Sequence, residues 1–95
     1  MAPPPATKSS LTYPPPVELL QNLIRFDTTN PPGNEAACIA YLRDLLVSAG
    51  CETTLLARAP ERPNLVSSLR GRGEAGPLLL YGHTDVVTAE NQQWQ

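Results

Sequence analysis

An apolar run at residues 78–81 places the strongest limit on how this chain folds. Gly76-Pro77 precede the run and Gly82 follows it, so it is too short for an isolated helix and is bounded by breakers of regular structure. The pattern predicts a buried β-strand. His83, the only histidine, and Asp85 come directly after it. Because ligands of open α/β sheets bind beyond the carboxyl ends of strands, we expect any chemistry of this chain to be found there.

The composition argues against several classes of protein. The net charge is −2 and the seven basic residues are scattered, so we expect no nucleic-acid partner. No apolar run approaches the ~18 residues of a membrane span, and the N-terminus lacks the pattern of a signal peptide. The sequence therefore predicts a cytoplasmic protein with no membrane partner. Cys38 and Cys51 lie in or beside apolar stretches, which favours free thiols over a disulfide.

The length of 95 residues allows one small domain at most. The chain ends soon after Asp85, with no closing element, so we expect an N-terminal portion of a longer protein. Residues 1–16 hold the blocks Pro3-Pro4-Pro5 and Pro14-Pro15-Pro16, and they predict a disordered lead-in that samples polyproline II. The alternative for this segment is a proline-rich ligand for an aromatic groove.

Two helices are expected after the lead-in. Apolar residues recur at helical spacing from Val17, and this helix should stop near Asp27, because Asn30 precedes a proline and is pushed out of the helical region. Asn34 can cap a second helix that ends at Ala49, where Gly50 can adopt the left-handed conformation. The apolar stripe of this second helix predicts that it packs on a sheet.

Strands are expected at residues 52–56 and 64–70, ahead of the run at 78–81. Gly71 and Gly73 lie in the loop between the last two. A phosphate-binding loop is disfavoured there, because no helix follows and a turn between strands explains the glycines. The order helix, helix, strand, strand, strand predicts an α/β layer architecture over residues 17–95.

His83 and Asp85 leave the same face of an extended segment, so their side chains can meet. Three interpretations stay open from these residues alone. Histidine is the commonest zinc ligand, and a carboxylate often orients a ligating imidazole. The pair could equally form a general base, although no nucleophile signature accompanies it. The simplest alternative is a surface histidine beside a solvated acid.

Several motifs, in order, resemble the dizinc aminoacylase and carboxypeptidase family, which includes acetylornithine deacetylase, succinyl-diaminopimelate desuccinylase and glutamate carboxypeptidase. The resemblance lies in Gly82-His83-Thr84-Asp85-Val86-Val87, which is similar to the family's first metal-ligand motif. It extends to the segment from Ile24 to Glu35 at the exit of the first helix, to Arg62-Pro63-Asn64-Leu65-Val66 at a strand, and to Trp94. Thr88 departs from the family, where proline is common.

The resemblance implies the first part of a zinc-peptidase-like α/β/α catalytic domain that hydrolyses an amide bond in an N-acyl amino acid or small peptide. It implies two Zn²⁺ ions, or Co²⁺ in their place, with His83 as a metal ligand and Asp85 as the catalytic residue that orients it. The family's other ligands, and its glutamate general base, would lie beyond Gln95. The family often forms homodimers through a further domain. We therefore expect the 95-residue chain alone to bind zinc weakly and to be inactive. The alternative is a non-catalytic α/β fragment without metal chemistry.

Overall fold

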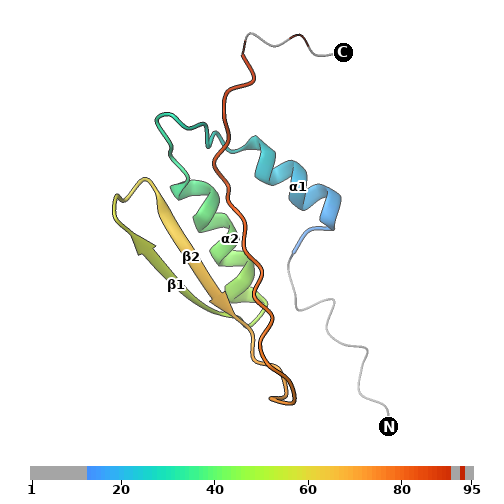
Figure 1. Cartoon of the computed structure of the whole chain (residues 1–95). Coiled ribbons are helices and arrows are strands. Elements are labelled where there is room, and N and C mark those ends of the chain that lie inside the picture. Colours follow the sequence, from blue (N-terminus) through green and yellow to red (C-terminus); the bar gives the residue numbers. More distant parts are fainter. Residues whose placement is uncertain (1–12, 91–92, 94–95) are drawn as a thin grey trace.

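The computed structural model describes residues 13–90 and residue 93. It shows a mixed α/β arrangement of two helices followed by a two-stranded sheet, which confirms the predicted class (Figure 1). The predicted disordered lead-in falls largely on residues 1–12, and these residues and Trp94 lie outside the described part. Within that part, neither helix is long and apolar enough to cross a membrane.

Helix α1 spans Pro16–Arg25 and begins with a proline in its first turn. Proline suits that position because the first helical N–H has no partner within the helix. The helix stops at Arg25, slightly before the expected end, since Phe26 is already extended with ψ 136°. Phe26, the C-cap residue, contacts Tyr41 of the next helix, with ring centroids 5.5 Å apart and ring planes tilted by 46°. No residue of α1 is fully buried.

Helix α2 spans Ala36–Ser48 and contributes the buried apolar residues Cys38 and Ile39. Burial raises the pKa of the Cys38 thiol, and both cysteines are free, as expected. The predicted cap was wrong, because Glu35 rather than Asn34 occupies the N-cap position and makes no side-chain capping bond. Gly50 follows the helix with φ +89°, the left-handed conformation predicted for it.

Strands β1 (Glu52–Ala57) and β2 (Pro63–Ser68) pair antiparallel, in a register that runs from Glu52 opposite Ser68 to Ala57 opposite Pro63. Helix α2 contacts both strands and lies along the sheet (Figure 1). The local patterns predicted both strands to within two residues of their ends. The result is a helix-on-sheet unit whose core lies under α2.

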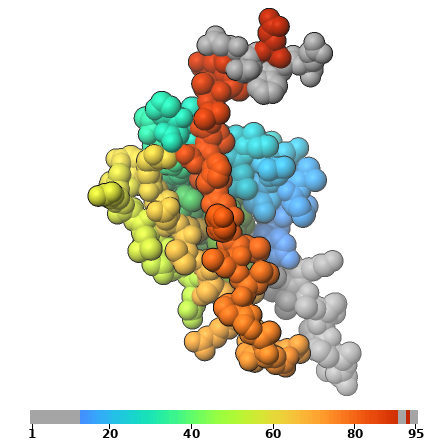
Figure 2. Space-filling model, in the orientation of Figure 1, coloured from blue at the N-terminus to red at the C-terminus, as the bar shows by residue number. Residues whose placement is uncertain are grey.

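The third expected strand is absent, which corrects the prediction for residues 78–81. These four side chains are between 81% and 95% exposed, and no described segment pairs with them. A strand needs a hydrogen-bonded neighbour, and β2 pairs only with β1 in the described part of the chain. The segment instead runs as an extended thread over the face shown in Figure 2. Its one sheet-like contact comes later, where Val86 forms a parallel bridge with Thr29.

Candidate functional site

The bridge between Thr29 and Val86 brings the His-x-Asp segment against the link between the two helices. The Asn30 N–H donates to the Val86 carbonyl at 2.7 Å, and the Val86 N–H donates to the Thr28 carbonyl at 3.1 Å. The Thr28 hydroxyl, on a residue only 4% exposed, donates to the Thr84 carbonyl at 2.6 Å. These three bonds fix the backbone of residues 84–86 relative to residues 28–30, in the link between the two helices.

His83 and Asp85 meet, as their spacing predicted. Nδ1 of His83 lies 2.9 Å from Oδ1 of Asp85 and 3.0 Å from the Asp85 backbone oxygen. An ionised carboxylate and a carbonyl only accept hydrogen bonds, so Nδ1 carries the proton in a neutral ring. Nε2 then keeps its lone pair. The His83 side chain is 82% exposed, so this lone pair is open to a ligand.

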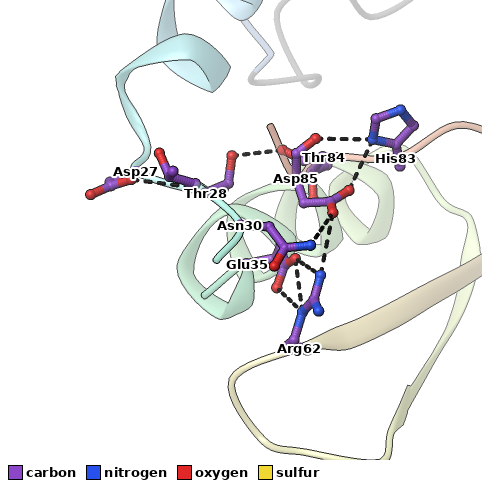
Figure 3. A network of polar contacts seen from close by, with 9 residues as sticks. Asp27, Thr28, Asn30, Glu35, Arg62, His83, Thr84 and Asp85 are labelled. Carbon is purple, nitrogen blue, oxygen red and sulfur yellow. Dashed lines mark hydrogen bonds and ion pairs between the residues drawn. The ribbon is translucent and has the colours of Figure 1, made fainter. Parts of the chain in front are cut away.

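Asp85 is held on its other side by two further donors. Nδ2 of Asn30 lies 3.1 Å from Oδ2 of Asp85, and Nη2 of Arg62 lies 3.3 Å from the same oxygen (Figure 3). The hydrogen bond from Asn30, followed by the contact with His83, holds the pKa of Asp85 below its ordinary value. The carboxylate is therefore ionised near neutrality, as an acceptor for Nδ1 must be.

Arg62 is itself clamped by Glu35. Nε donates to both Glu35 carboxylate oxygens at 3.1 and 3.2 Å, and Nη2 donates to Oε1 at 2.8 Å. The Glu35 side chain is 7% exposed, so this ion pair is largely shielded on its acidic side. The hydrogen bonds from Arg62 lower the pKa of Glu35, and those from Glu35 raise the pKa of Arg62. Both groups are charged at neutral pH.

The polar residues line a groove of about 600 Å³ between α2, the start of β2 and residues 82–85. His83, Asp85, Arg62 and Glu35 all contribute to its wall, and Ile39 supplies an apolar part. The predicted site residues therefore lie together at the edge of a groove large enough for a small molecule.

Sequence reasoning did not place Asn30, Glu35 and Arg62 at the site. The sequence placed Asn30 and Glu35 in the segment at the exit of the first helix, with Asn30 before a proline, and placed Arg62 at the start of a strand motif. Arg62 is 27 residues from Glu35, and a single sequence carries no signal for a pairing over that distance. The available hint was that all three residues lie inside the segments that resemble one family.

The residues that the structure describes do not make up a complete metal site. The described residues contain no group of three or more histidine, cysteine, aspartate or glutamate side chains that could hold an ion. His83 alone, with Nδ1 on a carboxylate and Nε2 exposed, has the chemistry of a zinc ligand. The described residues could supply one ligand to a zinc ion, which is too few for a complete site.

Comparison with known proteins gives similarities to two kinds of enzyme. The chain is 32% identical over 81 residues to N-formyl-4-amino-5-aminomethyl-2-methylpyrimidine deformylase of Halalkalibacterium halodurans, an alignment that covers 81% of this chain and 19% of that protein. It is 42% identical over 62 residues to acetylornithine deacetylase of Vibrio cholerae serotype O1, covering 65% of this chain and 16% of that protein. Both names describe enzymes that remove an acyl group.

The similarity is restricted in extent. The chain spans about a fifth of the length of these curated relatives. No protein-family model matches the chain, and no solved structure matches it.

Proposed function

We propose that this chain is the first part of a zinc-dependent amide hydrolase of the dizinc aminoacylase and carboxypeptidase family. The observation that carries the proposal is the 2.9 Å contact between Nδ1 of His83 and Oδ1 of Asp85, which leaves Nε2 exposed. The similarity to a deformylase and a deacetylase supports the same reaction class. The substrate would be an N-acyl amino acid or a small peptide.

In this proposal His83 supplies one ligand to a two-metal centre, and Asp85 is the catalytic residue that orients its ring. Zinc, or cobalt in its place, would polarise the amide carbonyl and lower the pKa of an attacking water. Asp85 stabilises the tautomer that presents the Nε2 lone pair and makes the imidazole a better donor. The remaining ligands and the general base would be supplied by residues beyond Gln95. A homodimer and a cytoplasmic location stay predictions.

The test is the metal content and activity of the protein that contains this chain together with its downstream sequence. We expect two zinc ions per chain and hydrolysis of N-formyl or N-acetyl amino acids, with one ion and most activity lost in His83→Ala. Tyr81→Phe is the matched control, because Tyr81 is near His83 in sequence and 95% exposed. Metal content and hydrolysis that do not change in His83→Ala would reject His83 as a ligand.

A second candidate is a non-catalytic α/β protein in which His83 binds no metal. The 82% exposure of the His83 side chain is the observation that favours it, because a surface histidine beside an acid needs no function. Zinc titration of the 95-residue chain adds to the test. The hydrolase proposal predicts weak binding that is abolished by His83→Ala, and the second candidate predicts no difference between the two chains.

A further inference from the structure

We propose that Asn30 and Arg62 are positioning residues that fix the carboxylate of Asp85 and thereby select the tautomer of His83. This inference deepens the proposed function and rests on it for its consequence in metal binding. The geometry divides the two oxygens of Asp85 between two tasks. Oδ1 faces Nδ1 of His83, and Oδ2 receives Asn30 and Arg62.

Among the described residues, Asn30, Arg62 and His83 are the ones that bond to the Asp85 carboxylate. The Asp85 side chain is 30% exposed, and it lies on an extended segment that pairs with no strand before Val86 in the described part of the chain. A carboxylate with only one oxygen bonded could rotate and offer either oxygen to the imidazole. Water could also replace it as the acceptor for Nδ1. Two donors on Oδ2 remove that freedom, because they define both the plane and the direction of the group.

The orientation of Arg62 is in turn set by α2. Three contacts of 2.8–3.2 Å attach the guanidinium to Glu35, and the Glu35 N–H donates to the Glu61 carbonyl at 2.9 Å. The planar fork of arginine can engage Glu35 through Nε while Nη2 also reaches Asp85. Lysine presents one ammonium group and lacks that fixed geometry. The start of α2, the turn before β2 and the His-x-Asp segment are therefore joined through one guanidinium (Figure 3).

Nδ1 of His83 has a second acceptor, the Asp85 backbone oxygen at 3.0 Å. Loss of the side-chain acceptor should therefore weaken the preference for the Nδ1–H tautomer without abolishing it. The proposal predicts a graded effect: Asp85→Ala should shift the tautomer population most, and variants of Asn30 or Arg62 should give an intermediate shift.

The test is ¹⁵N NMR of the neutral imidazole in the metal-free 95-residue chain. His83 is the only histidine, so its two ring nitrogens are observed without overlap. We expect mainly Nδ1–H in the wild type, and a several-fold rise in the Nε2–H population in Arg62→Met, Arg62→Lys and Asn30→Ala. Arg72→Met is the control, since it removes the same charge from an exposed ion pair with Glu74. Its tautomer population should equal that of the wild type.

Folding is checked from the amide spectrum of each variant. If Arg62→Met does not fold, Asn30→Ala and Arg62→Lys serve as the test variants, because each removes fewer contacts from the structure. A wild-type tautomer population in folded Asn30→Ala and folded Arg62→Lys overturns the proposal. If Asn30 and Arg62 had a purely structural role, their variants would have lower thermal stability and an unchanged tautomer population. That outcome also contradicts the positioning role.

This result is independent of whether the protein is a hydrolase, since no metal or substrate is present. If the tautomer responds in the variants but the extended protein binds no zinc, the positioning roles stand and the proposed function is rejected. In the extended protein, we expect Arg62→Lys to lower zinc affinity by about 10–100-fold, the range typical of residues that support a metal ligand. Unchanged affinity there, with a shifted tautomer, would limit the role to orientation of the free ring.

Discussion

Gly33 sits where the absence of a side chain is needed for the guanidinium of Arg62. A Cβ built on Gly33 would lie 2.6 Å from Nε and 2.8 Å from Cζ of Arg62. Gly33 also has φ +79°, a conformation that side chains disfavour. Alanine at this position therefore has two separate effects, one on the local backbone and one on the arginine that reaches Asp85.

We expect Gly33→Ala to lower the free energy of unfolding by about 1–2 kcal/mol from the backbone conformation alone. It should in addition displace Arg62 and raise the Nε2–H population of His83. Gly73→Ala is a close control, because Gly73 has the same φ of +79° and no atom lies within 4 Å of the place its methyl group would take. Denaturant unfolding and histidine NMR measure the two effects. A tautomer change of equal size in both variants would contradict the link between Gly33 and Arg62.

The sequence predicted the part of the site whose residues are close together in the chain. His83 and Asp85 are two residues apart, and an extended backbone brings such side chains to one face, so their contact followed from spacing. The residues that support this pair are different in kind. Asn30 is 55 residues from Asp85, and only the tertiary fold, through the bridge at Thr29, brings them together.

At the scale of elements, the strands also differ in whether a local pattern is enough to predict them. Strands β1 and β2 were predicted from their residue patterns, and in the structure a five-residue connection pairs them with each other. Residues 78–81 have an equally strong apolar pattern, yet a pattern cannot supply the neighbour that makes a strand. Helix α2 was placed correctly by its periodicity, but its first residue was not. Glu35 occupies the N-cap position, but its carboxylate binds Arg62 and does not cap the helix.

The junction of α2 with the turn before β2 should make stability depend on acidity. Arg62 lowers the pKa of Glu35 from its ordinary value of 4.5. A group whose pKa is depressed by folding stabilises the protein fully above its unfolded pKa, and this contribution is lost as the pH falls through the folded value. The loss from Glu35 therefore begins below about pH 4.5. Asp85 and Asp27 have lowered pKa values as well, so they add to the same trend.

We expect Glu35→Gln to have a lower Tm at neutral pH and a smaller fall in Tm on acidification, since it lacks one of these carboxylates. Thermal unfolding followed by circular dichroism from about pH 7 to about pH 3 measures both effects. Glu52→Gln, at the exposed start of β1, should follow the wild-type curve. A Glu35→Gln curve that runs parallel to the wild type would show that the buried carboxylate does not control the acid response.

Across the whole molecule, apolar side chains are distributed unevenly. The buried apolar residues of the described part are Cys38 and Ile39, both on α2. Residues 78–81, in contrast, form a contiguous apolar strip in which each residue is more than 80% exposed. An extended segment with unpaired backbone and uncharged apolar side chains is a template for pairing with another chain. The length and composition of the chain gave no sign of this, because they report how much apolar surface exists and not where it lies.

We therefore expect the 95-residue chain to associate as its concentration rises, through residues 78–81. Leu79→Lys should weaken this association, because it places a charge in the middle of the strip. Leu69→Lys makes the same change of charge at another leucine, 73% exposed but outside the strip, and should associate like the wild type. Sedimentation velocity over a concentration series distinguishes them. If Leu69→Lys and Leu79→Lys shift the association equally, net charge rather than the strip controls it, and a monomeric wild type at every concentration rejects the expectation outright.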